Sequence, residues 1–544
     1  MSLNPTIGQY LLTRLHQLGV RHIFGVPGDY ILRFYQQITE SSIEHIGTTR
    51  EDTAAFAADG YARCQGLGAV AVTYGVGALN VVNAIACAHA ESSPVIVISG
   101  APGVKEQRER PLLHHRFGPF HLQREIFERI TCAVAVLDDP YAAFRQVDRV
   151  LAAAKAHCKP VYIEIPRDRV DIPGYPMPAE LLPDNASDPD SLREAIQETL
   201  QLLQQAKAPV LVAGVELHRR SLQEQLLTLV NKCQLPIAAT LTGKSVMGER
   251  HPCYLGIYEG AMGSAIARET VEQADFLLML GVTLNDVDLG IFTAKLDANR
   301  TVRASQNEVI VHHHRYPNIS LHDFVTALNE QLTTVRPILE PLAHTLAVTD
   351  FPIAKQPLTI HRLIAKLDQF LTPEMRVVCD TGDCLFAAMD LRVHENSEFL
   401  AAAFYTTMGF AVPAALGAQI ANPSRRTLIL VGDGAFQMTG TELSTIARLG
   451  LNPIVIVFNN RGYSTERFIL DGPFNDIMPW RFDQLGELFG PLKGVLVETE
   501  DEFDMALSAA LYEQHQPFLI NVLLSPDDPS PAMRRLAEHL GKLI

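Results

Sequence analysis

Two short polar segments of the chain carry oxygen ligands at a spacing that suits a metal-bound diphosphate. The segment Val431-Gly432-Asp433-Gly434 is separated from Asn459-Asn460 by 24 residues. Asp433 offers a carboxylate and Asn460 an amide carbonyl, both hard oxygen donors suited to Mg²⁺ or Ca²⁺. A helix opened by Gly434 would present free backbone N–H groups and its positive dipole end to a diphosphate. Because the lysine of a Walker loop is absent, a metal would have to neutralise the phosphate charge.

The predicted secondary structure brings these two segments together. Apolar strands over 427–431 and 453–458 flank a helix at about 441–449, which makes one βαβ unit. Parallel strands joined by such a crossover end at the same edge of the sheet. Open α/β sheets bind their ligands at that edge. We therefore expect Asp433 and Asn460 to lie close together there.

The alternation of strands and helices extends along the whole chain and predicts an α/β fold of three parallel-sheet domains. We expect these domains over residues 1–180, 190–340 and 356–544, each large enough to bury its own core. Proline-bearing stretches at 172–189 and 337–357 indicate the two connections. The middle segment is Rossmann-like in pattern but lacks a GxGxxG motif, so we expect no dinucleotide there.

Composition narrows the class of protein without identifying a substrate. The 544 residues are 47% hydrophobic and 19% charged, with a formal net charge of −16, which is typical of a soluble globular protein. The negative charge argues against nucleic acid and anionic membranes as partners. No apolar run approaches the ~20 residues of a membrane span. With no secretory pattern in the first residues and eight scattered cysteines, we expect a cytoplasmic protein with reduced thiols.

Several further polar residues could be catalytic, but each also has a simple structural interpretation. Asp29 follows a Pro-Gly turn and could be a turn residue. Glu51 precedes an Ala-rich helix and could merely complement the helix dipole. His114-His115 lies in a predicted surface loop. The run His312-His313-His314 falls on a predicted strand, where neighbours point to opposite faces, so we expect structural or surface histidines rather than a metal site.

Taken together, the motifs resemble the thiamine-diphosphate-dependent 2-oxo acid decarboxylases, in the branch of the pyruvate, indolepyruvate and phenylpyruvate decarboxylases. The matching stretches, in the same order as in that family, are FGVPGDY, REDTAAFAADGYAR, TYGVGALN and LLHH in the first segment and TGDCLF, VGDGAFQMTGTE and NNRGYSTERFILDGPFNDI in the third. The resemblance implies thiamine diphosphate and Mg²⁺ as cofactors. It implies metal binding by Asp433, Asn460 and the main-chain carbonyl of Gly462, and cofactor contacts from Gly432, Gly434 and Ala435.

The resemblance also implies roles for residues outside the metal site. Glu51 matches the carboxyl group that exchanges a proton with the aminopyrimidine ring of the cofactor. The carbonyl of Thr406 would accept the 4′-amino group, and Met408 would support the bent shape of the cofactor. The residues that match the family's proton relay for product formation are Asp29, His114, His115 and Glu466. Which of the four delivers which proton is left open.

The implied reaction is the non-oxidative decarboxylation of a small-molecule 2-oxo acid to an aldehyde and CO₂, which makes the protein a lyase. Leu385 stands where pyruvate-preferring relatives can carry Trp, and Thr465 replaces Ile or Val. Both changes shrink the walls of the pocket and predict a substrate larger than pyruvate, either aromatic or branched/medium-chain. The remaining pocket residues expected are Thr73, Phe386 and Ile469.

In the resembling family, the domain that carries Glu51 meets the metal-binding domain of a neighbouring subunit. A homodimer would then be the minimum, and a homotetramer is expected. One alternative is a thiamine-diphosphate carboligase of the acetolactate-synthase type, against which the histidine pair and the PGDY turn argue. Another is a metal- and nucleotide-binding regulatory protein without turnover, which would need no proton relay.

Overall fold

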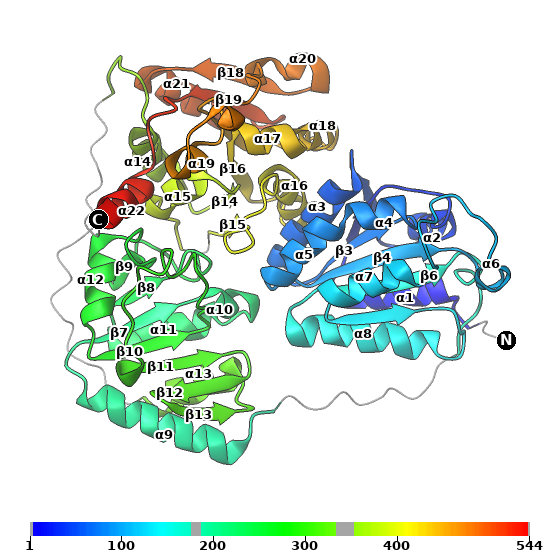
Figure 1. Cartoon of the computed structure of the whole chain (residues 1–544), viewed down its shortest axis with the longest axis horizontal. Coiled ribbons are helices and arrows are strands. Elements are labelled where there is room, and N and C mark those ends of the chain that lie inside the picture. Colours follow the sequence, from blue (N-terminus) through cyan, green and yellow to red (C-terminus); the bar gives the residue numbers. More distant parts are fainter. Residues whose placement is uncertain (1–3, 176–185, 333–352, 396, 542–544) are drawn as a thin grey trace.

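The computed structural model describes residues 4–175, 186–332, 353–395 and 397–541, and in it three α/β units follow one another along the chain (Figure 1). Much of both expected connections, 172–189 and 337–357, lies outside the described residues. Two of the three sheets are fully parallel and the third is mostly so, which confirms the predicted fold class. Within the described residues, no helix has the length and apolar character to cross a membrane.

The N-terminal unit is a six-stranded parallel sheet of order β2-β1-β3-β4-β6-β5. All seven residues of β4 are buried, because helices cover both faces of a parallel sheet. The strands are β1 (His22–Gly25), β2 (Glu44–Gly47), β3 (Gly68–Val72), β4 (Val95–Ala101), β5 (Ala133–Val136) and β6 (Val161–Pro166). The helices are α1 (Ile7–Gln17), α2 (Leu32–Thr39), α3 (Glu51–Gln65), α4 (Val76–Asn80), α5 (Val82–Ala90), α6 (Val104–Glu109), α7 (Leu122–Ile130) and α8 (Ala143–His157).

The central unit is a seven-stranded sheet of order β13-β12-β11-β10-β7-β8-β9, in which β12 and β13 are antiparallel. The strands are β7 (Pro209–Ala213), β8 (Ile237–Ala239), β9 (Tyr254–Ile257), β10 (Phe276–Leu280), β11 (Thr301–Ser305), β12 (Glu308–Val311) and β13 (His314–Pro317). The α-helices are α9 (Pro189–Gln205), α10 (Val215–Arg219), α11 (Gln223–Cys233), α12 (Ala265–Gln273) and α13 (Leu321–Gln331).

The strand predicted through His312–His314 is wrong, because His312 and His313 form the hairpin turn between β12 and β13. His312 has a φ of 55°, a left-handed conformation that turns the chain. His313 contacts Asn299 and His314 contacts Glu198, so these neighbouring imidazoles face different partners.

The C-terminal unit is a six-stranded parallel sheet of order β15-β14-β16-β17-β19-β18. Its strands are β14 (Met375–Cys379), β15 (Phe399–Ala401), β16 (Arg426–Gly432), β17 (Ile454–Asn459), β18 (Lys493–Val497) and β19 (Phe518–Leu523). Its α-helices are α14 (Ile360–Phe370), α15 (Asp383–Ala387), α16 (Ala411–Ala421), α17 (Asp433–Thr439), α18 (Leu443–Arg448), α19 (Ser464–Ile469), α20 (Gly486–Phe489), α21 (Glu500–Tyr512) and α22 (Pro531–Gly541).

The predicted βαβ unit around the two polar segments is present, with a different helical connection. Strands β16 and β17 pair in parallel, with Gly432 opposite Phe458. The expected helix at 441–449 is only the last part of the crossover. Helix α17 begins earlier, at Asp433, and a 3₁₀ turn over Gly440–Glu442 joins it to α18. Asp433 and Asn460 therefore both lie at the carboxyl edge of the sheet.

Helices α3 and α16 join the N-terminal unit to the C-terminal unit. A Cβ atom on Gly417 would lie 1.8 Å from the carbonyl oxygen of Ala57, so glycine permits the close approach of the two backbones. The rings of Phe56 and Phe410 are 6.0 Å apart, and the Gln65 amide donates to the Ala421 carbonyl. These contacts place the helices side by side in the same direction.

Candidate active site

Asp433 is held at the carboxyl end of β16 by backbone donors. It is 2% exposed, its Oδ1 accepts from the N–H of Gly434 at 2.8 Å, and its Oδ2 accepts from the N–H of Arg461 at 2.6 Å. Burial raises the pKa of Asp433 to about 6, against the lowering effect of these hydrogen bonds. A buried carboxylate without a cation is costly, so a bound cation would be stabilised here.

Asn460 supplies an unpaired acceptor beside Asp433. Its side-chain amide donates to Ser464 Oγ at 3.0 Å, while its Oδ1 is buried and has no hydrogen-bond partner among the described residues. A buried polar atom without a partner requires an explanation, and a bound ion is one that these neighbouring oxygens would fit. The pair of oxygen donors would fit a hard divalent cation.

The space in front of α17 and α15 suits a diphosphate. A Cβ atom on Gly432, just before α17, would meet no atom within 4 Å. The same holds for Gly382, which precedes α15 and has a φ of 121°. Asp383, the next residue, is buried, and its Oδ2 accepts from the N–H of Ser530 at 2.9 Å. Its Oδ1 has no partner within the described parts of the chain.

The loop that carries Thr406 and Met408 is anchored by Asp380, which the sequence analysis missed. The Asp380 carboxylate accepts from the N–H of Gly409 at 2.9 Å and of Ala411 at 2.7 Å. Thr406 has a φ of 53°, a strained conformation for a β-branched residue that needs such support. Asp380 follows an apolar strand at the same sheet edge as Asp433, and that position could have revealed it.

Glu51 is the first residue of α3 and contacts the neighbouring helix α4. Its Oε2 accepts a 2.7 Å hydrogen bond from the side-chain amide of Asn80, a residue that the sequence analysis did not single out. Three residues further on, Asn83 donates to Thr407 Oγ1 at 3.0 Å. The segment from Asn80 to Asn83 thus ties the Glu51 carboxylate to the loop around Thr406.

The structure brings three of the four predicted relay residues together. His114 Nε2 lies 2.7 Å from Asp29 Oδ2, and His115 Nε2 lies 3.9 Å from Asp29 Oδ1. The ring of Tyr30 lies 5.0 Å from that of His114. Glu466, on α19, is exposed, and no hydrogen bond or ion pair joins it to the other three in the described parts of this single chain.

The five predicted pocket residues differ in exposure. Thr73 and Leu385 are buried, at 6% and 1% exposure, whereas Ile469 is 77% exposed. Phe386 and Thr465 are half-buried. The hydroxyls of Thr73 and Thr465 have no partner among the described residues. Leu385 belongs to the hydrophobic core around β14, so within one chain it underlies the site rather than facing open space.

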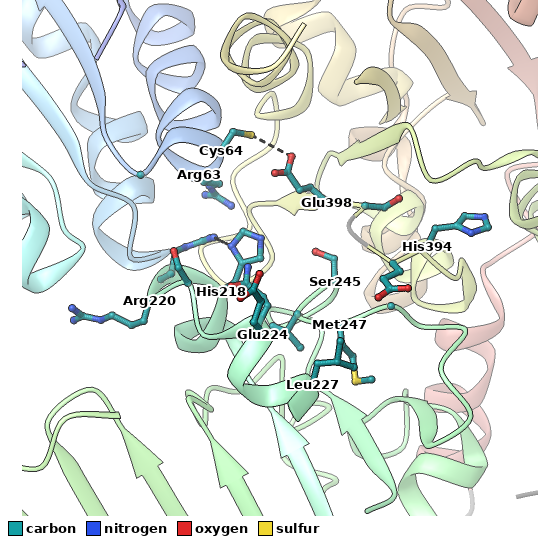
Figure 2. Close-up of a pocket in the computed structure, with 18 of the residues that line it drawn as sticks. Arg63, Cys64, His218, Arg220, Glu224, Leu227, Ser245, Met247, His394 and Glu398 are labelled. Atoms are coloured by element: carbon teal, nitrogen blue, oxygen red, sulfur yellow. Dashed lines mark hydrogen bonds between the residues drawn. The ribbon is translucent and has the colours of Figure 1, made fainter. Parts of the chain in front are cut away.

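A large cavity lies elsewhere, where the three units meet. It has a volume of about 1330 Å³, and Figure 2 shows Arg63, Cys64 and Glu398 above His218 and Glu224. None of the predicted site residues lines it. Size alone would select this cavity, but the unpaired oxygen donors and the histidine pair lie outside it.

Comparison with known proteins assigns all three units to one family. The chain matches the family models described as "Thiamine pyrophosphate enzyme, N-terminal TPP binding domain" over residues 5–124, "central domain" over 196–332 and "C-terminal TPP binding domain" over 372–522. It is 37% identical to an indole-3-pyruvate decarboxylase of Azospirillum brasilense, over 99% of this chain and 98% of that protein. It is 35% identical to an alpha-keto-acid decarboxylase of Mycolicibacterium paratuberculosis, over 95% of this chain and 94% of the relative.

Proposed function

We propose a substrate class, a metal and an assembly for this chain on the premise that it belongs to the thiamine-pyrophosphate-dependent 2-oxo acid decarboxylases. The family makes it a lyase that releases CO₂ from a 2-oxo acid. When bound, thiamine diphosphate supplies the nucleophilic carbon and the electron sink for that reaction. The observation that carries the assignment of the site is the unpaired Oδ1 of Asn460 beside Asp433, at a sheet edge open for a diphosphate.

The proposed substrate is an aromatic or branched/medium-chain 2-oxo acid, larger than pyruvate. Leu385 and Thr465, smaller than the residues of pyruvate-preferring relatives, leave room for a larger side chain. The relative named indole-3-pyruvate decarboxylase supports an aromatic substrate. Thr73, Phe386 and Ile469 would form the rest of the pocket.

The proposed metal is Mg²⁺, bound by Asp433, Asn460 and the carbonyl of Gly462. The backbone N–H groups along Gly432, Gly434 and Ala435 would hold the diphosphate at the start of α17. These protein ligands are all oxygen donors, which suits the preference of Mg²⁺ for hard ligands.

We assign the proton chemistry to side chains that the structure orients. The Glu51 carboxyl group, held by Asn80, would share a proton with N1′ of the aminopyrimidine ring. The Thr406 carbonyl would accept the 4′-amino group, and Met408 would pack beneath the bend of the cofactor. Asp29, His114, His115 and Glu466 would protonate the product carbon and release the aldehyde.

The proposed assembly is a homodimer at least, and a homotetramer in full, with each site shared by two chains. Glu466 is exposed among the described residues, as are its neighbours Ile469 and Leu470 at 77% and 67%, and these side chains would meet the histidine pair of a partner. The proposed limits of the N-terminal, central and C-terminal domains are 1–180, 190–340 and 356–544. The free thiols of all eight cysteines support a cytoplasmic location.

The test is to load the protein with Mg²⁺ and thiamine diphosphate and to supply pyruvate, 2-oxoisovalerate, phenylpyruvate and indolepyruvate separately. We expect aldehyde from each substrate that is turned over, with the highest kcat/KM for one larger than pyruvate. A preference for pyruvate would overturn the substrate proposal. Acetolactate as the main product from pyruvate would instead favour the carboligase.

A further inference from the structure

Asp29, His114 and His115 form a cluster whose geometry suits a transition metal. Each residue offers one ligand atom, and these atoms all lie within 4.8 Å of one another. A search of the described residues for three or more acidic, histidine or cysteine side chains that could hold a metal ion finds this one group. All three come from the N-terminal unit, so one chain supplies the complete set.

The backbone explains why two consecutive histidines can face one ion here. His115 has a φ of 63°, a left-handed conformation that turns its side chain to the same side as that of His114. The two rings lie 4.7 Å apart, and both Nε2 atoms lie within 3.9 Å of the Asp29 carboxylate. The run His312–His314 contrasts with this pair, because His313 and His314 contact different partners.

We propose that this cluster is a binding site for Zn²⁺ or an ion of the same type, distinct from the Mg²⁺ site. Two imidazoles and one carboxylate, with a water in the fourth position, form an open zinc site. Zinc bonds of 2.0–2.1 Å at tetrahedral angles place ligand atoms roughly 3.3 Å apart. His114 Nε2 lies 2.7 Å from Asp29 Oδ2 and His115 Nε2 lies 3.9 Å from Asp29 Oδ1, so binding through one carboxylate oxygen requires a small rotation of that group.

The surroundings permit the small adjustment that binding requires. The side chains of His114, His115 and Asp29 are 59%, 33% and 40% exposed in the single chain, so packing within that chain leaves them free to adjust. The nearby cation Arg167 is already paired with Glu106, which reduces its repulsion of an ion.

Binding would inhibit the enzyme, and this consequence rests on the proposed function. A zinc ion takes the Nε2 lone pairs of both histidines and an oxygen of Asp29, so the relay residues can no longer exchange protons. The Mg²⁺ site would not compete for zinc on equal terms, because it offers oxygen donors and no imidazole. Inhibition should therefore persist in excess Mg²⁺.

The experiment uses Co²⁺ as a spectroscopic probe for the zinc site in the holoenzyme with excess Mg²⁺. We expect an intense visible absorption from four- or five-coordinate Co²⁺, displaced by about one equivalent of Zn²⁺. His114→Gln should weaken Co²⁺ affinity by about tenfold or more. Loss of a residue that only hydrogen-bonds a metal ligand already costs about tenfold, and His114 would be a ligand itself. His313→Gln, in the other histidine run, is the matched control and should bind Co²⁺ normally.

Turnover provides a separate measurement. Zn²⁺ at micromolar concentration should inhibit the unmodified enzyme and the His313→Gln variant equally, and a zinc-selective chelator should restore activity. No Co²⁺ band, or the same band in His114→Gln, would overturn the proposed site. A normal Co²⁺ band in a protein that decarboxylates no 2-oxo acid would leave the metal site standing and overturn the proposed function instead.

Discussion

The side-chain amide of Asn80 donates a 2.7 Å hydrogen bond to Oε2 of Glu51. The bond fixes one carboxylate oxygen of Glu51 and leaves the other for a ligand. A Cβ atom on Gly77 would lie 3.5 Å from that other oxygen, Oε1, so helix α4 packs closely against the carboxylate. This orientation suits the acid–base role proposed for Glu51, because proton transfer requires a side chain positioned within hydrogen-bond reach of the reacting group.

Replacing Glu51 with glutamine should abolish most turnover while the cofactor still binds. Glutamine keeps the shape and the contact with Asn80 but cannot exchange a proton, and general acid–base catalysis typically contributes 10²–10⁴-fold. Steady-state kinetics measures the loss of turnover, and calorimetric titration with thiamine diphosphate measures whether the cofactor still binds. Asn80→Ala, which removes only the orienting bond, should lose less activity. Near-normal turnover in Glu51→Gln would remove Glu51 from the mechanism.

Alanine substitution of two adjacent asparagines should affect different properties, cofactor binding in one variant and thermal stability in the other. Asn460 has an unpaired Oδ1, so Asn460→Ala should weaken Mg²⁺-dependent cofactor binding about tenfold or more. Asn459 is equally buried but donates to Asn521 Oδ1 at 3.0 Å, so Asn459→Ala should lower Tm and leave the Mg²⁺ dependence unchanged. The Mg²⁺ concentration for half-maximal cofactor binding is the measurement. The same shift in both variants would contradict the metal assignment of Asn460.

The stability of the metal-free protein should fall as the pH rises through neutrality, partly because of Glu164. Burial raises the pKa of Glu164 to about 7 from a usual value of 4.5. The folded state therefore favours the protonated form, and this contribution is complete below pH 4.5 and lost as the pH rises through 7. The full loss is roughly 3 kcal/mol.

Glu164→Gln should remove this dependence, because glutamine can still accept the hydrogen bond from the Tyr162 hydroxyl and never ionises. The variant should be more stable than the unmodified protein at pH 8, with a flatter profile of Tm between pH 4.5 and 8. Glu40→Gln, at an exposed position, is the control and should leave the profile unchanged. An unaltered profile in Glu164→Gln would show that Glu164 ionises as easily in the folded chain as in the unfolded one.

The substrate pocket can be tested by restoring bulk at two positions. Leu385→Trp and Thr465→Ile should each reduce kcat/KM for phenylpyruvate more than for pyruvate, because the larger substrate needs the space. Leu385 is 1% exposed, so tryptophan also risks overpacking by about 1–3 kcal/mol, and Tm must be measured alongside. Thr465 is half-buried and avoids that risk. Equal losses for both substrates in Thr465→Ile would refute the pocket assignment.

The sheet edge was predictable because its strands are strong signals. Strands β16 and β17 are continuous apolar runs that end in glycine and asparagine, so their type and direction follow from the sequence. The helical connection was placed too late, at about 441–449, because α17 is short and contains Gly434, a poor helix former. It forms because packing overrides propensity, with Phe436 only 1% exposed against the core.

Contacts between distant segments were not predictable in the same way. The bonds from Asn80 to Glu51 and from Asn83 to Thr407 join residues 29 and 324 positions apart. Nothing in the local pattern of either asparagine distinguishes it from a surface residue of a helix. The cluster of Asp29 with His114 likewise depends on how two loops fold together. These residues were grouped only because they match the proton relay of the resembling family.

Two inactive variants should restore activity when they share a dimer. If each site combines Glu51 of one chain with Asp433 of the other, a heterodimer of Glu51→Gln and Asp433→Asn has one doubly altered site and one intact site. Purified by two different tags after co-expression, it should show about half the normal specific activity, because a two-fold dimer holds two equivalent sites. Each homodimer should be nearly inactive and serves as the control. If Glu51 and Asp433 of the same chain formed the site, every site in the heterodimer would be altered, and activity would stay at the level of the homodimers.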